Sequence, residues 1–259
     1  MSTQYDAIGA SYNNMSKLPG AGLVYLCIQQ TVEPLIKHGD VKVLDLACGT
    51  GRFTHALRAW GAKSVLGVDI SPAMINAACG AGIRDANIKF EVGDCAQPDV
   101  RYADAPFDLV LSCWLLNYAA SGAEMADMFR HAAGNLRAGG SMLAMTPCAS
   151  EDPVRHIEEA AKVRPKAMGE VHLENIGAVE EGIRIRVWAG TEPEIVQFDS
   201  YHLRKSVYEK AARDRGFKGR LEWTDCRIPK LARERGEYDE EWEKFAKIPH
   251  SSILVVTKE

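Results

Sequence analysis

The sequence lacks the features that mark membrane, secreted and nucleic-acid-binding proteins. No apolar run approaches the roughly 18 residues that a spanning helix needs, and the start, MSTQYDAIGASYNN, has no basic segment followed by an apolar one. No block of lysine or arginine stands out, and the net charge of −4 gives no general attraction to nucleic acid or to an anionic membrane. We therefore expect a cytoplasmic protein with small or neutral partners, no targeting segment and no membrane contact.

Cysteine and histidine are present, but in no metal-binding arrangement. The seven cysteines are odd in number and form no C-x-x-C pair, which favours reduced thiols in the cytosol. The seven histidines are scattered and form neither an H-x-x-x-H motif nor a cluster with cysteine. The sequence therefore predicts no metal site.

Short apolar stretches alternate with helical patterns over residues 41–147. With 46% apolar and 25% charged residues, the 259-residue chain has the composition of a soluble globular protein. The alternation predicts βαβ units, a parallel sheet and right-handed crossovers. The expected strands are VKVLDLA, SVLGVDI, IKFEVGD, FDLVLSCWLL and SMLAMTP.

The pattern changes after Pro147. Residues 182–190 and 194–203 both alternate between apolar and polar side chains, which predicts an antiparallel hairpin inserted late in the chain. A helix should follow at 205–215, and SSILVVTKE should form the final strand. We interpret the charged run 230–247 as a solvated helical face, or as part of a rim over the site. One domain is expected, in four parts: a helical N-terminal lid at 1–40, a ligand-binding core at 41–147, a cap at 148–204 and a completion of the sheet at 205–259.

The stretch KVLDLACGTGRFTHAL places two glycines between a strand and a helix. Gly49 and Gly51 permit unusual backbone angles and let a ligand approach main-chain N–H groups at the carboxyl edge of a strand. A dinucleotide site would instead use G-x-G-x-x-G to hold a pyrophosphate. Asp45 would add an anion beside such a phosphate, so this segment favours a cationic group.

Acidic residues also follow the next two strands. Asp69 is placed to accept hydrogen bonds from both hydroxyls of a ribose, and Gly93-Asp94-Cys95 can present an acceptor and a backbone N–H to an adenine edge. The alternatives are structural: Asp45 and Asp94 as strand-end turn formers, and Asp69 as a helix cap. Together the three strand ends fit a nucleoside with an ammonium group and no phosphate.

This constellation resembles the class I S-adenosylmethionine-dependent methyltransferases. The resemblance rests on VLDLACGTGRF, VLGVDIS, VGDC and FDLVLSCWLLNYA, and it covers about residues 40–147. It implies an α/β fold with a Rossmann-like, seven-stranded, mostly parallel sheet and helices on both faces, here with a helical N-terminal segment and an inserted antiparallel cap. It also implies S-adenosylmethionine as cofactor.

The same resemblance assigns the residues that bind the cofactor. Cys95 and Met74 also have structural interpretations, as a small packing residue and as a core residue. The implied residues contact the methionine end (Asp45, Ala47, Gly49, Gly51), the ribose (Asp69, Ile70) and the adenine (Met74, Asp94, Cys95), and Trp114 makes an additional contact.

The segment after the fourth strand concerns the acceptor. SCWLLNY lacks the Asn/Asp-Pro-Pro-Tyr of enzymes that methylate base or glutamine amino groups, which argues against nucleic acid. QYDAIGASYNN together with SCWLLNYA resembles the toxoflavin-pathway methyltransferases and related small-molecule N-methyltransferases. The resemblance implies methyl transfer to a nitrogen, less readily an oxygen or sulfur, of a small molecule in specialised metabolism.

Candidate catalytic residues come from the N-terminal segment, the fourth strand end and the cap. Tyr5 and Tyr12 can fold over the sulfonium and the acceptor, or pack between helices. Trp114, Asn117 and Tyr118 can shape the acceptor pocket, or belong to the core. His172 and His202 are candidate bases, or hydrogen-bonded and surface histidines. The transfer itself is an in-line displacement that depends on alignment and on exclusion of water.

Two other functions use the same type of fold. A nicotinamide-dependent dehydrogenase is disfavoured because the third glycine is absent, and a catalytically silent S-adenosylmethionine-binding module is disfavoured by the intact strand-end acids. The sequence predicts an enzyme that works as a monomer or a weak homodimer.

Overall fold

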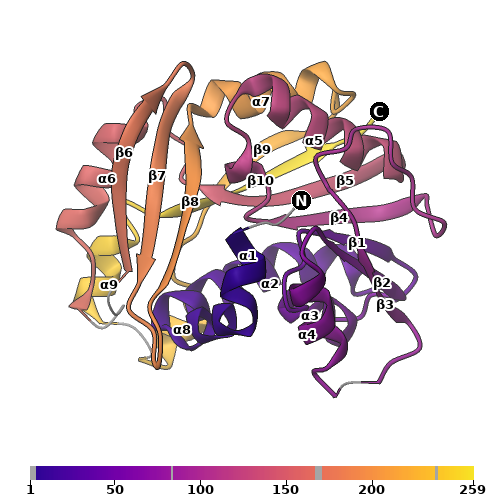
Figure 1. The fold of residues 1–259 in the computed structure, drawn as a ribbon, viewed down its shortest axis with the longest axis horizontal. Coiled ribbons are helices and arrows are strands. Elements are labelled where there is room, and N and C mark those ends of the chain that lie inside the picture. The colour runs from indigo at the N-terminus through magenta and orange to yellow at the C-terminus, as the bar shows by residue number, and fades with distance from the viewer. Residues whose placement is uncertain (1–3, 83, 167–170, 237–238) are drawn as a thin grey trace.

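A computed structural model describes the chain except for residues 1–3, 83, 167–170 and 237–238, and it contains two sheets (Figure 1). The larger sheet confirms the predicted fold class. Its strands, in spatial order, are β3 (Ile88–Val92), β2 (Ser64–Asp69), β1 (Lys42–Leu46), β4 (Phe107–Cys113), β5 (Leu136–Pro147), β10 (Ser251–Thr257) and β9 (Leu221–Asp225).

The strand order reverses between β1 and β4. From β3 to β5 all neighbours are parallel, whereas β10 runs antiparallel to both β5 and β9. In the register, Asp45 near the carboxyl end of β1 lies between Gly67 of β2 and Leu111 of β4. A crevice forms beyond the carboxyl ends of the strands at such a switch point, which is where open α/β sheets bind ligands.

Helices cover both faces of this sheet because its buried strands are apolar on both sides. Along β1, Val43 packs in one cluster with Ile28 of α2, while Leu44 packs in the other with Phe129 of α5. The helices are α2 (Pro19–Ile36), α3 (Arg52–Ala59), α4 (Pro72–Cys79), α5 (Gly122–Asn135), α7 (Lys205–Asp214), α8 (Lys230–Glu234) and α9 (Glu240–Phe245), with a short 3-10 turn, η2 (Leu116–Tyr118).

The smaller sheet forms the cap and is antiparallel, as predicted for the late hairpin. It has three strands: β6 (Val171–Val179), β7 (Gly182–Ala189) and β8 (Val196–Leu203), preceded by helix α6 (Pro153–Lys162). Alternate residues of β7 are buried, so one face is apolar, and Ile157 of α6 packs in the same cluster. A Cβ at Gly182 would lie 2.3 Å from the His202 carbonyl oxygen, so the β6–β7 turn requires glycine there.

The N-terminal segment joins the cap to the core. It begins with α1 (Gln4–Ile8) and a 3-10 helix, η1 (Gly9–Lys17), which contact α4 on the core side, and η1 also contacts β8 on the cap side. Tyr5, Ile8 and Tyr12 pack against the apolar face of the cap. Residues 4–17 therefore lie across the carboxyl edge of the large sheet, and we refer to them as the lid segment.

In α9 the charged run 230–247 has a buried side in addition to the solvated face that we predicted. Trp242 and Phe245 are buried there, with 4% and 3% of their surface exposed, and they pack in the α2 cluster. The acidic residues at the start of α9 are capped by Asp239, whose side chain accepts hydrogen bonds from two backbone N–H groups. In this helix the charges form only the outer face.

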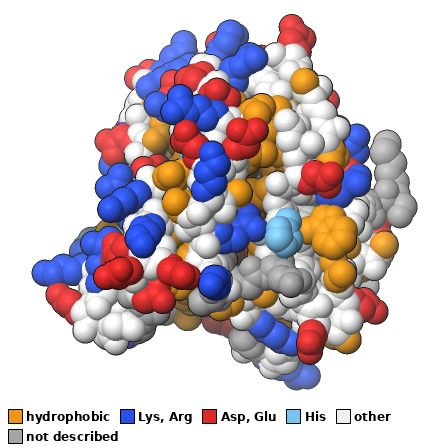
Figure 2. All heavy atoms as spheres, turned by 90° about the vertical axis from the view of Figure 1, so that its left-hand side faces the viewer, with side chains coloured by type: hydrophobic (Ala, Val, Ile, Leu, Met, Phe, Trp, Pro, Cys, Tyr) orange, Lys and Arg blue, Asp and Glu red, His pale blue; other side chains and the backbone are white. Residues whose placement is uncertain are grey.

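The outer face of the cap side carries acidic and basic side chains intermixed, with no continuous basic surface in this view (Figure 2). Within the part of the chain that the structure describes, no helix is both long and apolar enough to span a bilayer.

Candidate active site

A cavity of about 50 Å³ lies beyond the carboxyl ends of β1, β2 and β4, beneath the lid segment. Three different parts of the chain meet there: the strand ends of the core, helix α4 and the N-terminus. The cavity is lined by Tyr5, Tyr12, Ala47, Gly49, Asp69, Met74, Cys113, Trp114 and Tyr118.

Asp69 is fixed at the floor of this cavity by two backbone N–H groups. Its carboxylate accepts hydrogen bonds from Gly49 N at 2.8 Å and from Ser71 N at 2.9 Å, and the residue is only 7% exposed. Burial raises the pKa of Asp69, and the bonds from Ser71 and Gly49 oppose that shift. A carboxylate has about four acceptor positions, so two remain for the hydroxyls of a ligand.

Asp45 lies beneath the glycine loop and does not line the cavity. The residue is 1% exposed, and its Oδ2 accepts a 2.6 Å hydrogen bond from the Thr54 hydroxyl. Burial raises the pKa of Asp45 to about 7, the Thr54 bond lowers it, and the nearby Asp69 charge raises it further. Only one side-chain hydrogen bond offsets the loss of hydration of this buried carboxylate, so it is suited to pair with a cation.

Two residues that line the cavity have left-handed backbone angles although neither is glycine. Ala47 has φ of +57° and Trp114 has φ of +66°, one after β1 and the other after β4. Such angles cost about 1–3 kcal/mol each and concentrate at functional sites. Backbone strain therefore marks the two strand ends that flank the switch point.

The two glycines of the loop have different structural roles. A Cβ at Gly49 would meet nothing within 4 Å, so the space beside it is open, although φ is +55°. A Cβ at Gly51 would lie 2.8 Å from the Phe90 ring and 3.2 Å from Ala78 Cβ, with φ of +82°. Gly51 is thus required by packing, whereas Gly49 leaves room for a ligand.

The lid segment is held by polar contacts with both the core and the cap. Ser71 Oγ donates a 2.6 Å hydrogen bond to Asp6, Thr50 Oγ1 bonds the Asn13 side chain, and the hydroxyls of Tyr5 and Tyr118 are hydrogen-bonded to each other. The side-chain amide of Gln4 also donates to the Asp199 carbonyl and accepts from its N–H, both at 3.0 Å, along the open edge of β8.

Aromatic rings from the lid segment and from the end of β4 line the same cavity. The Tyr5 ring packs edge-on against Tyr12 at 5.6 Å and against Tyr118 at 5.8 Å between ring centres. Burial raises the pKa of Tyr12 to about 12 and that of Tyr118 still further. These tyrosines are therefore neutral at physiological pH.

The loop after β3 is fastened to α5 by a buried network that the sequence did not indicate. His131 contacts the Gln97 carbonyl at 2.6 Å and the Tyr102 hydroxyl at 3.1 Å, and Asn135 accepts from Tyr102 N. Asp94, at the start of this loop, accepts from Ala96 N at 2.9 Å. The network fixes the backbone that follows Asp94.

The structure brings some of the predicted site residues together and leaves others outside the cavity lining. Cys113 lines the cavity but was not predicted, because a cysteine inside an apolar strand carries no signal of its own. Eight predicted residues line it: Tyr5, Tyr12, Ala47, Gly49, Asp69, Met74, Trp114 and Tyr118. Eight do not: Asp45, Gly51, Ile70, Asp94, Cys95, Asn117, His172 and His202.

Some of these outer residues lie close to the lining in sequence, and others do not. Ile70 is 41% exposed directly after Asp69, and Cys95 is buried behind the loop. His172 is exposed on β6, and His202 is buried on β8 with its Nε2 2.8 Å from the Cys148 carbonyl. Within the described ranges, no group of three or more His, Cys, Asp or Glu side chains could hold a metal ion.

Comparisons with known proteins agree with this geometry. Residues 43–140 match the family described as methyltransferase domain. Phosphoethanolamine N-methyltransferase 1 of Arabidopsis thaliana is 31% identical over 106 residues, which are 41% of this chain and 21% of that protein. Malonyl-[acyl-carrier protein] O-methyltransferase of Paenibacillus sp. (strain JDR-2) is 31% identical over 113 residues, 42% of this chain and 40% of that protein.

The match covers the strands and loops that form the cavity floor. Residues 43–140 therefore match a methyltransferase domain, in agreement with the resemblance to class I S-adenosylmethionine-dependent methyltransferases. The match supports S-adenosylmethionine as the cofactor that the resemblance implied. The matched segments span 21% and 40% of the two curated methyltransferases, so the similarity concerns this part of each protein alone.

The whole fold has a counterpart among solved structures. The sugar N-methyltransferase KedS8 from Streptoalloteichus sp. ATCC 53650 is 20% identical, with a TM-score of 0.58 over 100% of this chain and 97% of that one. At this identity the likeness concerns the fold alone. It includes the cap and the lid segment because the match extends over the full chain.

Proposed function

We propose that the protein transfers a methyl group from S-adenosylmethionine to a nitrogen atom of a small molecule. The observation that carries the proposal is the cavity at the switch point, whose lining combines the Asp69 carboxylate with four aromatic residues. Both ligands would meet there, because the strand ends bind the nucleoside and the lid and cap enclose the acceptor.

The residues around the cavity fit the cofactor. Asp69 has two acceptor positions for ribose hydroxyls, and Gly49 leaves open space where a side chain would obstruct the methionine part. Asp45 would face the ammonium group from below. We assign Ile70, Met74, Asp94 and Cys95 to the ribose and adenine, as the resemblance implied, while Gly51 supports the loop through its packing against Phe90.

The reaction needs alignment more than acid–base chemistry. S-adenosylmethionine supplies a methyl group on a positively charged sulfur. The chain aligns the acceptor for in-line attack, and the lid segment excludes water from the site. The rings of Tyr5, Tyr12 and Trp114 offer electron-rich faces to the cation, a contact of about 0.5–2 kcal/mol.

The lining favours a nitrogen acceptor. No histidine or lysine is among the described residues that line the cavity, and the tyrosines are neutral because burial raises their pKa. An alcohol would require a base to remove its proton, whereas a neutral amine or ring nitrogen attacks with its own lone pair. The names of two similar proteins, which act on nitrogen, support this choice, and the Paenibacillus relative marks oxygen as the alternative.

The aromatic walls favour a flat, uncharged acceptor. Tyr5, Tyr12, Trp114 and Tyr118 provide ring faces and hydroxyls but no formal charge. A phosphorylated amine or a carrier-protein thioester would require cations or a wide opening, which the cavity does not offer among these residues. A small nitrogen heterocycle matches the lining.

The lid segment must move for ligands to bind. A cavity of about 50 Å³ is smaller than the roughly 300 Å³ at which ligand pockets begin. Tyr5 and Tyr12 of residues 4–17 line this cavity, and the segment is attached by side-chain hydrogen bonds and apolar packing. We therefore propose that this segment opens to admit both ligands and closes over them.

Calorimetric titration with S-adenosylmethionine and a screen for S-adenosylhomocysteine release test the proposal. The screen would compare nitrogen heterocycles, amines, phenols and thiols. We expect micromolar cofactor binding, and turnover with heterocycles or amines. Asp69→Asn should weaken cofactor binding at least tenfold, because hydrogen bonds to charged groups contribute about 1.5–3 kcal/mol.

Asp40→Asn is the matched control. Asp40 is a highly exposed aspartate paired with Lys63, and exposed pairs contribute little. Turnover of phenols alone would reject the nitrogen assignment. Cofactor binding without turnover of any acceptor would instead favour the silent binding module, and absence of binding would reject both.

A further inference from the structure

A second, larger cavity lies at the opposite edge of the sheet from the candidate active site. Its volume is about 310 Å³, and it is lined by Pro98, Asp99, Val100, Arg101, Arg130, Ala133, Gly134 and Lys258. The loop before β4, the end of α5 and the residue after β10 meet there, which places the cavity at the amino ends of the parallel strands. No step of the proposed methyl transfer uses it.

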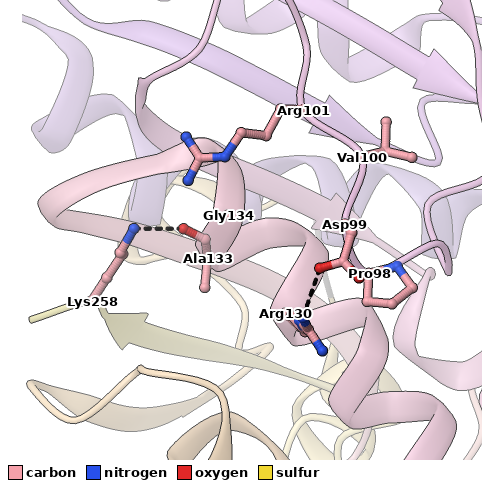
Figure 3. A pocket seen from close by; sticks show the side chains of 8 residues that line it. All are labelled: Pro98, Asp99, Val100, Arg101, Arg130, Ala133, Gly134 and Lys258. Carbon is pink, nitrogen blue, oxygen red and sulfur yellow. Dashed lines mark hydrogen bonds and ion pairs between the residues drawn. The ribbon is translucent and has the colours of Figure 1, made fainter.

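The lining is cationic although the chain as a whole carries a net charge of −4. Arg101, Arg130 and Lys258 contribute three positive charges, and Asp99 contributes one negative charge. Arg130 and Asp99 form an ion pair at 2.7 Å and offset each other. Two positive charges therefore remain, those of Arg101 and Lys258, and they lie on the side of the cavity away from the ion pair (Figure 3).

Arg101 offers its full set of donors. The side chain is exposed, and within the described part of the chain its guanidinium makes no hydrogen bond or ion pair. A guanidinium has five N–H groups in a planar fork that matches the oxygens of phosphate or carboxylate. A free fork at a cavity wall is suited to bind such an oxyanion in bidentate fashion.

Lys258 is already positioned. Its ammonium donates to the Ala133 carbonyl at 2.7 Å and to the Leu136 carbonyl at 2.8 Å, which leaves one N–H directed elsewhere. These bonds satisfy carbonyl groups at the C-terminal end of α5. The ammonium therefore lies between an anion in the cavity and the negative end of the helix dipole. Partial burial and the charge of Arg101 lower the pKa of Lys258, as expected where a counter-charge is missing.

We infer that this cavity binds a phosphate group, which Arg101 and Lys258 would hold against the Asp99–Arg130 pair. The ligand is either the free anion or the phosphate of a small ester, since both present the same oxygens. The inference is independent of the proposed methyl transfer, because none of these residues lines the active-site cavity.

Calorimetric titration of the full chain with inorganic phosphate tests the site, at constant ionic strength maintained with chloride. We expect saturable binding to one site with a dissociation constant near or below about 1 mM. Arg101→Gln should weaken it at least about tenfold, the loss expected for a charge-assisted bond. Arg84→Gln removes the same charge from an exposed position elsewhere and should leave binding unchanged.

A variant that keeps all charges provides a second test. A Cβ at Gly134 meets nothing within 4 Å, so Gly134→Leu can be accommodated in the helix and would occupy part of the cavity. It should abolish phosphate binding while S-adenosylmethionine binding is retained. A parallel titration with glycerol 3-phosphate separates the two sources, since tighter binding of the ester identifies an ester site and weaker binding identifies a free-anion site.

Three results would overturn the inference. They are the absence of saturable heat with either probe, an equal loss in the Arg101→Gln and Arg84→Gln variants, and unchanged binding in Gly134→Leu. Cofactor titration of the same samples distinguishes these failures from failure of the methyltransferase proposal, because that site lies at the other edge of the sheet.

Discussion

The Ser71 hydroxyl donates a 2.6 Å hydrogen bond to Asp6 and so joins the lid segment to the corner between β2 and α4. The same oxygen accepts from Met74 N, so Ser71 caps α4 while it holds the lid. Burial is the main cause that raises the pKa of Asp69, and the nearby charge of Asp6 raises it further. The lid contact is therefore adjacent to the residue that we assign to the ribose.

Asp6→Ala should loosen the lid without unfolding the protein. A hydrogen bond to a charged group contributes about 1.5–3 kcal/mol, less where water competes, so we expect hydrogen exchange of residues 4–17 to accelerate at least fivefold. The melting temperature should change by less than about 2 °C, because the lid contributes little to the two main cores. Asp40→Ala is the control, and unchanged exchange in Asp6→Ala would show that this bond does not hold the segment.

The two glycines of the loop should respond differently to alanine. Gly51→Ala should lower stability by about 2 kcal/mol or more, because the left-handed angle adds to the close contact with Phe90. Gly49→Ala should lower stability only by the cost of the left-handed backbone angle, about 1 kcal/mol. It should weaken cofactor binding more than it lowers stability. Urea unfolding and calorimetry measure both effects. Phe90→Leu should partly restore Gly51→Ala, and equal behaviour of the two glycines would contradict this division.

Cofactor affinity should rise with pH as Asp45 ionises. Burial raises the pKa of Asp45 to about 7, and only the ionised carboxyl attracts the ammonium of the ligand. At pH 6 most protein molecules carry a proton on Asp45 that must be released on binding. We therefore expect cofactor affinity to increase about fivefold from pH 6 to pH 7. Titration in two buffers of different ionisation enthalpy should reveal proton release. Asp45→Asn should bind weakly with no such dependence, and a flat profile in the unaltered protein would reject the pairing.

Acid should destabilise the contact between the cap and the core. Burial lowers the pKa of His202 to about 4, and burial, Arg164 and His156 lower that of His250 to about 3. A histidine kept neutral by folding contributes full stability above its unfolded pKa of about 6.5, and this stability is lost as pH falls toward the folded value.

Among the described residues, the charged groups that act on these two histidines are His156 on both and Arg164 on His250, so no described negative charge offsets their protonation. Each histidine should cost at most about 1.4 kcal/mol per pH unit below pH 6.5. Urea unfolding at pH 7 and pH 5 measures the loss. His202→Gln and His250→Gln should reduce the pH dependence, whereas His172→Gln, on the exposed face of β6, should leave it intact.

The sequence predicted the parallel core well because periodicity and strand-end chemistry are local. Asp69 and Gly49 could be predicted from the strands that precede them, and both line the cavity. The third cap strand, β6, was missed because its alternation breaks at the irregularity between Asn175 and Gly177. Strand β9 was missed because five residues with two acidic side chains carry a weak signal.

Long-range contacts could not be predicted from local patterns. The bond between Tyr5 and Tyr118 joins residues far apart in sequence, and neither neighbourhood indicates the other. The burial of Trp242 depends on its position against α2, while its own segment is highly charged. The separate roles of Gly49 and Gly51 likewise depend on Phe90, which lies on another strand.

The lid segment and the cap share one apolar cluster, in which Tyr5, Ile8 and Tyr12 pack against Val187 and Phe198. Withdrawal of the segment alone would leave the cap's apolar face open to water, which is unfavourable in proportion to the area exposed. Lid and cap would therefore move together as one unit. In kinetic terms, cofactor exchange and acceptor exchange then depend on one shared opening rate, and neither product could dissociate while the other was fully enclosed.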